Sequence, residues 1–205
     1  MVPAIDALQR LRVGNQRFVS NQGNLDSLVL SAQRSVAVEG QKPFAVILGC
    51  SDSRVPVELV FDQGLGDLFV IRIAGNVVAS SQIGSVEFAV ERFGVRLVVV
   101  LGHSRCGAVT ATLEEIQRPT RNRSRGLSSI VDRIRPSVEG LLETDAVGDY
   151  DTMLWQAVRA NVRASANWLR FGSDILEREV REGGLLVVGA QYSLETGAVE
   201  FFDGA

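Results

Sequence analysis

Histidine and cysteine are scarce in this chain, which has one His and two Cys among its 205 residues. Two cysteines cannot form the set of disulfides that stabilises a small extracellular scaffold, and a chain of this length buries enough apolar surface to fold without one. The chain also lacks an excess of positive charge, because Lys and Arg total 21 against 24 Asp and Glu. We therefore expect no nucleic acid and no anionic membrane among its partners.

Long apolar runs and a secretory leader are also missing. No stretch approaches the roughly 18 apolar residues that span a bilayer, and residues 1–6 lack the basic flank and apolar core of a signal segment. A signal segment removed before Met1 would leave no trace, so the sequence does not decide between cytoplasm and periplasm. A hydrophobic fraction of 46% is typical of a globular protein. We predict a single domain over 1–205, with an N-terminal helical arm at 1–40 and an α/β core at 41–205.

The pattern of apolar residues predicts an α/β fold. Helical spacing occupies residues 4–19, 81–93, 106–118, 127–142 and 152–171, and more weakly 27–38. Apolar runs at 44–49, 68–73, 96–101 and 185–190 are too short for buried helices and are typical of parallel strands. Their alternation indicates a mostly parallel central sheet with helices on both faces. Residues 197–202 could add an antiparallel C-terminal edge strand.

Two familiar motifs are absent. Gly64 and Gly66 have no third glycine at the dinucleotide spacing, and no glycine-rich segment ends in Gly-Lys-Ser or Gly-Lys-Thr, so neither a Rossmann fingerprint nor a phosphate loop is present. The run Gly102-His-Ser-Arg-Cys106 resembles a nucleophile elbow, but a cysteine replaces its last glycine. Because the sole histidine adjoins Ser104 in sequence, a serine triad is improbable.

The scarce residues gather after two predicted strands. Cys50 follows the run 44–49, and His103 and Cys106 follow the run 96–101. In an open parallel sheet, ligands bind beyond the carboxyl ends of the strands. Two thiolates and one imidazole suit Zn²⁺ and leave a fourth position for water or substrate. Any one of these residues alone is more often a buried thiol or a structural histidine, so the prediction of one Zn²⁺ per chain rests on the set.

Two charged residues follow Cys50 at alternate positions. Asp52 can accept a hydrogen bond from metal-bound water, and Arg54 can hold that carboxylate ionised and oriented through a bidentate pair. Taken alone, the two would be a surface ion pair beside a turn. Next to Cys50 they indicate a catalytic pair.

The segment Cys50-Ser-Asp-Ser-Arg-Val55, followed by Gly102-His-Ser-Arg-Cys-Gly107, resembles the paired motif of the β-class carbonic anhydrases. The resemblance continues through 66–76, 85–90 and 189–192. It implies zinc-dependent reversible hydration of carbon dioxide to bicarbonate and a proton, by zinc-bound hydroxide. Cys50, His103 and Cys106 would be the zinc ligands, and Asp52 with Arg54 the catalytic dyad.

The same resemblance implies a substrate pocket and an assembly. Gln41 matches an amide near bound bicarbonate, Phe69 and Phe88 match positions that line the carbon dioxide pocket, and Gly107 belongs to the substrate site. Phe88 stands where some relatives have Tyr, so no role that needs a hydroxyl is implied. The family forms homodimers that often pair into homotetramers, with the first helix lying on a neighbouring subunit and the cleft at the subunit boundary.

Regulation is expected to differ from that of some relatives. In those, the aspartate that Asp52 matches becomes a fourth metal ligand in a closed state, favoured by bicarbonate in a side pocket of Trp, Arg and Tyr. Arg72 and Tyr192 match two of these positions, but Ile47 stands where the Trp would be and has no indole N–H. We expect an open site at neutral or higher pH, without strong bicarbonate inhibition through that pocket.

Two alternatives remain open from the residues. A zinc hydrolase of the same fold could act on carbon disulfide or carbonyl sulfide, which are linear analogues of carbon dioxide. A non-catalytic zinc store or thiol redox protein could use Cys50 and Cys106, although storage needs no proton acceptor such as Asp52. In a carbonic anhydrase or a hydrolase with this site, the sole histidine binds the metal, so it cannot shuttle protons.

Overall fold

The computed structural model describes residues 1–23, 38, 40–119, 124–142 and 149–205. The strands are β1 (Ala45–Gly49), β2 (Leu68–Arg72), β3 (Leu97–His103), β4 (Leu186–Tyr192) and β5 (Val199–Asp203). The helices are α1 (Ala4–Val19), α4 (Val57–Val60), α5 (Ser80–Phe93), α6 (Gly107–Gln117), α7 (Arg125–Val138), α8 (Tyr150–Phe171) and α9 (Asp174–Arg181), with 3₁₀ turns η1 (Ala74–Asn76) and η2 (Glu139–Leu142). The predicted helix at 27–38 falls, apart from residue 38, outside the described residues.

The sheet has the order β2-β1-β3-β4-β5 in the described part of the chain. The first four of these strands are parallel and β5 is antiparallel to β4. β1 and β3 are buried along their whole length, as the continuous apolar runs of parallel strands predict. The predicted α/β fold and the antiparallel edge strand are confirmed.

The strand order places a topological switch point between β1 and β3. From β1 the chain continues to β2 on one side, whereas β3 leads to β4 on the other. At such a point the connections leave in opposite directions, so the carboxyl ends of the two strands border an open crevice. Gly49 pairs with Leu101, so Cys50 lies level with the end of β3.

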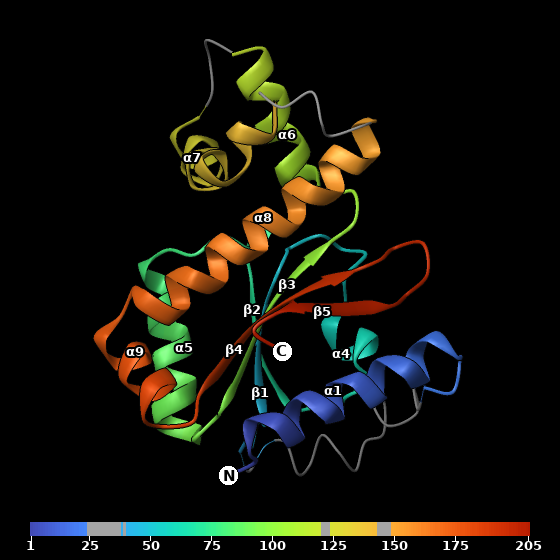
Figure 1. The fold of residues 1–205 in the computed structure, drawn as a ribbon. Helices are drawn as coiled ribbons and strands as arrows, with labels where there is room; N and C mark the ends of the chain where they lie inside the picture. The colour runs from blue at the N-terminus through green and yellow to red at the C-terminus, as the bar shows by residue number, and fades with distance from the viewer. Residues whose placement is uncertain (24–37, 39, 120–123, 143–148) are drawn as a thin grey trace.

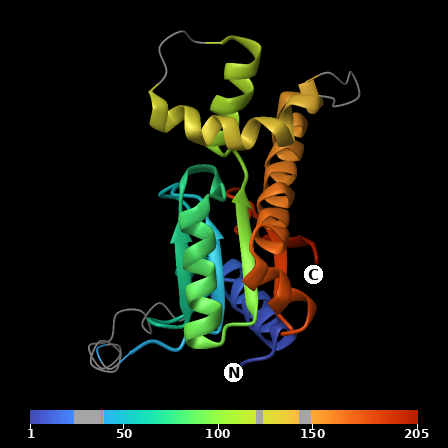
Figure 2. The ribbon, with the colours of Figure 1, turned by 90° about the vertical axis from the view of Figure 1, so that its left-hand side faces the viewer.

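Helices cover both faces of the sheet, and a further group lies beyond its carboxyl end (Figure 1). Ile47 and Val99 face α1 and α4, whereas Val46 and Val98 face α5, α8 and α9, because successive strand side chains point to opposite faces. The view in Figure 2 shows α6 and α7 past the end of β3. A third apolar cluster joins α6, α7 and the first half of α8, and it includes Cys50.

The first helix packs on its own sheet. Leu8 and Leu11 are buried in the core beneath α1, and Phe18 packs against that core from the side. The resemblance implied that this helix lies on a neighbouring subunit. In the structure these three side chains pack on the sheet of their own chain instead. Ile5, in contrast, is 68% exposed.

A buried asparagine explains why α1 stays on the sheet. The Asn15 amide donates to the carbonyl oxygens of Val60 (3.0 Å) and Gly197 (2.9 Å), and its oxygen accepts from the backbone N–H of Val199 (2.8 Å). Each of these partners needs a hydrogen bond once it is buried. The helix is thereby tied to α4 and to the β4–β5 hairpin.

Close packing of α8 lets β3 extend two residues past its predicted end. A Cβ on Gly102 would lie 2.6 Å from Cγ2 of Val162, and one on Gly189 would lie 2.9 Å from Cγ1 of the same residue. Gly102 therefore marks a close approach of helix to sheet rather than a break in the strand. Pairing with β4 continues through His103 and Tyr192, so the histidine is held by the sheet itself.

Within the described ranges, no helix combines the length and apolarity needed to cross a lipid bilayer.

Candidate metal centre

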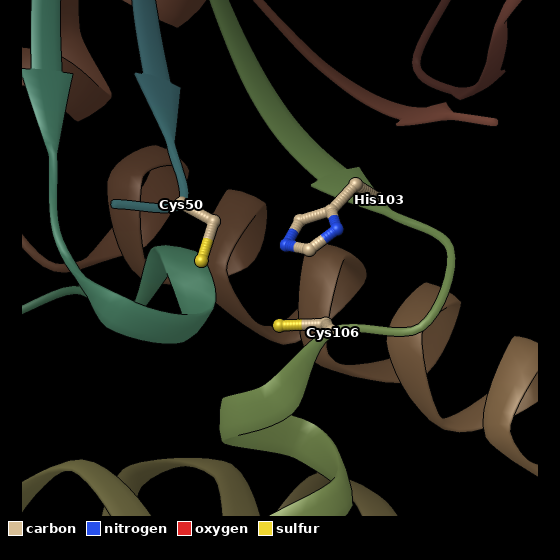
Figure 3. Close-up of side chains that lie close together, drawn as sticks. All are labelled: Cys50, His103 and Cys106. Atoms are coloured by element: carbon tan, nitrogen blue, oxygen red, sulfur yellow. The ribbon is translucent and has the colours of Figure 1, made fainter. Parts of the chain in front are cut away.

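Three side chains from two strand ends and one helix start converge at the switch point (Figure 3). Cys50 directly follows β1, His103 is the last residue of β3, and Cys106 is the N-cap residue of α6. One potential ligand atom from each lies within 4.8 Å of the others, and all three residues are buried. The structure therefore brings together the three residues predicted from the sequence to bind metal.

The histidine ring has one free nitrogen. Nδ1 of His103 lies 2.9 Å from the carbonyl oxygen of Ser104. Because a carbonyl only accepts hydrogen bonds, Nδ1 carries the proton and Nε2 keeps its lone pair. Nε2 is buried and has no hydrogen-bond partner among the described residues, which is costly for a polar atom unless a bound ion or ligand contacts it.

Ionising both free cysteines would place two negative charges side by side in a buried site, which is unfavourable without a cation. The hydrogen bond from the Cys106 thiol lowers the pKa of Cys50, and the backbone N–H of Gly75, 3.3 Å from its sulfur, acts in the same direction. The pKa of Cys106 is raised, because its thiol bonds to Cys50 and because burial disfavours a second negative charge. A divalent cation would remove this conflict.

This donor set fits zinc. Tetrahedral Zn²⁺ with thiolate and imidazole ligands places its ligand atoms about 3.3–3.8 Å apart, as bond lengths of roughly 2.3 and 2.0 Å require. A separation within 4.8 Å among the atoms of Cys50, His103 and Cys106 is compatible with that geometry. The unpartnered Nε2 and the soft thiolates both favour this metal over hard cations such as Mg²⁺.

The predicted dyad is formed beside these ligands. Arg54 donates from Nε to Oδ1 of Asp52 (2.9 Å) and from Nη2 to Oδ2 (2.7 Å), and its backbone N–H also reaches Oδ1 at 3.0 Å. These bonds hold the pKa of the Asp52 carboxyl well below its usual range. Oδ2 lies 3.9 Å from Nε2 of His103, so the carboxylate borders the candidate metal position.

Arg72 holds the loop that carries both Cys50 and Asp52. Its Nε donates to the Cys50 carbonyl oxygen at 3.0 Å, and its Nη2 donates to the Asp52 carbonyl oxygen. The other two residues of the implied side pocket, Ile47 and Tyr192, are both buried in the core under α1 and α4. The role of Arg72 in shaping this loop has no signal in the sequence.

The predicted pocket residues are not all gathered around the candidate metal ligands of one chain. Gly107 begins α6 directly after Cys106, but Gln41 precedes β1, at the opposite end of that strand from Cys50, and lies against Gly66. Figure 1 shows these two ends of β1 well separated across the sheet. Within one chain, Gln41 therefore cannot contact the candidate metal ligands.

The two predicted pocket aromatics lie together on another part of the sheet. The ring centroids of Phe69, on β2, and Phe88, on α5, lie 6.2 Å apart. The ring of Phe93 contacts both. Phe88 is 52% exposed. Phe69 and Phe93 pack against the cluster under α5, α8 and α9, whereas the cysteines belong to the one that joins α6, α7 and α8.

Two residues that the sequence analysis missed support Cys50. Gly75 has a φ of 66°, and a Cβ there would lie 2.8 Å from Cδ1 of Ile134. Its N–H faces the Cys50 sulfur and its carbonyl accepts from the buried Asn161 amide at 2.7 Å. The Gly-Asn pair after β2 is a turn signal, but nothing in the sequence links Asn161 to it.

Comparisons with known proteins agree with this geometry. A sequence model of the family described as carbonic anhydrase matches residues 45–199. Carbonic anhydrase 2 of Mycobacterium tuberculosis is 39% identical over 193 residues, covering 94% of this chain and 90% of that protein. A carbonic anhydrase of Mycolicibacterium smegmatis is 39% identical over 197 residues, covering 96% and 92%.

Solved structures give the same result. A tetrameric β-carbonic anhydrase of Sordaria macrospora superposes with a TM-score of 0.73 at 25% identity, over 82% of this chain and 85% of that one. The β-carbonic anhydrase CcaA superposes with a TM-score of 0.73 at 26% identity, over 96% and 95%. The chain belongs to the β-carbonic anhydrase family of enzymes.

Proposed function

We propose that this protein catalyses the reversible hydration of carbon dioxide to bicarbonate and a proton, with one Zn²⁺ held by Cys50, His103 and Cys106. The observation that carries the proposal is the buried Cys-His-Cys cluster with an Arg-bound carboxylate beside it. Zinc, when bound, acts as a Lewis acid that makes a water molecule nucleophilic near neutral pH. The remaining steps fall to side chains of the chain itself.

Asp52 accepts a hydrogen bond from the reacting water. Its Oδ2 lies beside the candidate metal position, so a water at the fourth position of a bound metal would be within reach of the carboxylate. Arg54 keeps this carboxylate ionised and fixed in orientation, since its guanidinium bonds to both oxygens. An acceptor held in this way orients a lone pair of the water toward its substrate.

The Arg54 contacts favour the open form of the site. For Asp52 to become a fourth ligand, its carboxylate would have to leave both guanidinium bonds and the backbone N–H. Ile47 offers a side pocket no indole N–H, and Arg72 is already bonded to two carbonyl oxygens. We therefore propose that bicarbonate does not strongly inhibit this enzyme through that pocket.

Proton release uses water, buffer or another carboxylate rather than an imidazole of this chain. Nδ1 of His103 is bonded to a backbone carbonyl and Nε2 faces the thiols, so the imidazole has no free position from which to pass a proton on. No other histidine exists in the chain. The rate at high turnover should therefore depend on the concentration of an added buffer.

Zinc content and carbon dioxide hydration, measured on the same samples, test the proposal. The parent should hold about one Zn²⁺ per chain, and Cys106→Ser should lose most of it, because a hydroxyl replaces a thiolate poorly. Asp52→Ala should keep zinc but lose about 10²–10⁴-fold in hydration. Arg54→Ala should also keep zinc and lose activity, because Asp52 is no longer held away from the metal.

For each expected result, a different outcome would refute the role assigned to that residue. Full zinc and full activity in Cys106→Ser would exclude this ligand set, and parental hydration by Asp52→Ala would exclude the acceptor role. Hydrolysis of carbon disulfide or carbonyl sulfide, with no hydration of carbon dioxide, would assign the site to that substrate class instead. Zinc binding without any of these activities would leave a storage or redox role.

We also propose that the active enzyme is a homodimer or homotetramer in which Gln41 reaches the site of a neighbouring subunit. Support comes from the position of Gln41 at the far end of β1 and from exposed apolar side chains such as Ile5 and Phe88. Sedimentation at micromolar concentration measures the assembly. A fully active monomer would contradict the proposal.

Subunit mixing tests the shared site directly. Gln41→Ala damages the pocket that a chain lends to its neighbour, whereas Cys106→Ser damages the metal site of the chain itself. After random exchange, half the dimers are mixed, and one of the two sites in each has both intact parts. Mixing two weakly active variants should therefore restore about a quarter of parental activity, and no recovery would place both residues in one chain's site.

A further inference from the structure

The orientation of His103 depends on one backbone carbonyl. The oxygen of Ser104 accepts the Nδ1 proton at 2.9 Å, and this bond directs the free Nε2 toward Cys50 and Cys106. Figure 3 shows the imidazole ring between the end of β3 and the sulfur atoms of Cys50 and Cys106. Any movement of the Ser104 peptide would turn the ring, because a metal-binding imidazole takes its tautomer and angle from the partner of its other nitrogen.

Ser104 is fixed from the far side by the β4–β5 hairpin. Its backbone N–H donates to the Tyr192 carbonyl at 2.9 Å, which extends the pairing of β3 with β4. Its hydroxyl accepts from the backbone N–H of Leu194 at 2.9 Å and donates to the Glu195 carboxylate at 2.7 Å. Both bonding directions of the hydroxyl are thus used.

Glu195 holds two consecutive residues of the segment between the metal ligands. Besides Ser104, it binds Arg105, whose Nε lies 3.0 Å from the other carboxylate oxygen. Arg105 has a φ of 54°, a conformation that a side chain disfavours and that needs support. The carbonyl of Arg105 in turn lies 3.5 Å from Nη2 of Arg54.

The hairpin turn also has hydrogen bonds of its own, including one from the Ser193 hydroxyl to the Glu195 carboxylate at 3.2 Å. The turn closes through the backbone bond from Gly197 to Ser193 (2.9 Å) and through the Ser193 hydroxyl, which accepts from the Thr196 N–H at 3.1 Å. The bonds from Glu195 to residues 104 and 105 instead cross about ninety positions of the chain. Their effect is to connect the hairpin to the segment that runs from His103 to Cys106.

We propose that Glu195 and Ser104 are positioning residues that set the angle of the His103 imidazole and thereby the affinity of the site for zinc. The inference rests on the proposed function, since it takes His103 to be a zinc ligand. The hydrogen bonds and the ion pair of these two side chains run to the hairpin and to residues 104 and 105 rather than to the three candidate ligands, so both act through the Ser104 carbonyl. Hydrogen bonding to Ser104 also keeps the pKa of Glu195 low, which leaves a charged acceptor at neutral pH.

The test compares metal binding in matched variants of the full-length protein. Zinc dissociation constants are measured by competition with a chromophoric chelator, and the visible spectrum is recorded after Co²⁺ replaces zinc. Ser104→Ala and Glu195→Ala should weaken zinc binding about tenfold or more and shift the Co²⁺ bands. Ser104→Thr keeps the hydroxyl and should restore both properties to parental values.

Glu200→Ala is the control. Glu200 lies on the same hairpin and pairs with Arg159 at 2.8 Å, so its loss removes a hairpin carboxylate without touching the ligand segment. A purely structural role of Glu195 would lower the unfolding midpoint of the metal-free protein but leave the dissociation constant and the Co²⁺ spectrum unchanged.

Two outcomes overturn the inference and are distinguishable. If the parent binds zinc tightly and Glu195→Ala stays within about twofold of Glu200→Ala, the positioning role is wrong while the proposed function stands. If the parent itself binds no zinc, both fail together. Should Ser104→Ala fail to fold, Glu195→Ala and Ser104→Thr decide the question without it.

Discussion

Adding one methyl group at Gly102 should destabilise this protein. The new Cβ would lie 2.6 Å from Cγ2 of Val162 and 2.9 Å from Cγ1 of Val158. Ordinary contact between carbon atoms is about 3.5–4.0 Å, so α8 or β3 would have to move by about 1 Å. Both valines are buried, at 0% and 1% exposure. Overpacking of this kind costs about 1–3 kcal/mol, and we expect Gly102→Ala to lose about 2 kcal/mol of unfolding free energy.

Urea unfolding measures this loss, at equal protein concentration and equal zinc content, because bound metal and assembly both shift apparent stability. Fluorescence of Trp155 and Trp168 reports on α8, the helix that must move. Gly84→Ala is the matched control: Gly84 is exposed within α5 and a Cβ there meets nothing within 4 Å. That control should gain about 0.5–1 kcal/mol, so the two substitutions should differ in sign.

A second variant isolates the clash from other effects. Val162→Ala alone should destabilise by loss of buried methyl groups, but in combination with Gly102→Ala it also makes room for the new Cβ. The double variant should therefore be at least about 0.5 kcal/mol more stable than the sum of the single losses. A Gly102→Ala protein with the parental midpoint, or strictly additive losses, would refute the argument for close packing.

Two further predictions concern α8. Asn161→Ala leaves the Gly75 carbonyl without its buried donor and should cost about 1–3 kcal/mol in thermal unfolding, whereas Asn167→Ala, on the exposed side of the helix, should cost far less; equal losses would contradict this. Asp149 caps the helix, and the backbone N–H of Thr152 lowers its pKa, so its stabilising effect is present above the ordinary carboxyl pKa and is lost as the pH falls through the lower folded value. Asp149→Asn has no such titration and should lose less stability than the parent between neutral pH and about pH 3; parallel acid-unfolding curves by circular dichroism would rule this out.

The sheet and the candidate metal ligands were predictable because each follows from a local pattern. Runs such as 97–101 are apolar at every position, which only a strand buried on both faces requires, and the structure buries that run completely. The ligands followed from the rule that parallel strands end at one edge of the sheet. The sequence could not show that β1 and β3 are neighbours, because β2 lies between them along the chain.

Other features had weak signals or misleading ones. Helix α9 buries only Leu176, so its apolar periodicity is too sparse to detect. The available signal was its termini, since Ser173 caps the helix and accepts from the Leu176 N–H at 3.3 Å, with acidic residues in the first turn and arginines in the last. Gly102 made the predicted strand too short, because a glycine after an apolar run usually weakens or ends a strand. The structure continues β3 through His103.

The fold explains why the candidate metal ligands could be predicted while the groups that hold them in place could not. Each ligand is held by a different part of the chain: Cys50 by the turn at Gly75, His103 by the hairpin through Ser104, and Cys106 by the start of α6. The groups that touch Cys50 and His103 are the backbone N–H of Gly75 and the carbonyl of Ser104, and backbone groups leave almost no trace in the sequence. A cation bound between the three ligands would join these parts, so that metal binding and the folding of this end of the sheet become coupled.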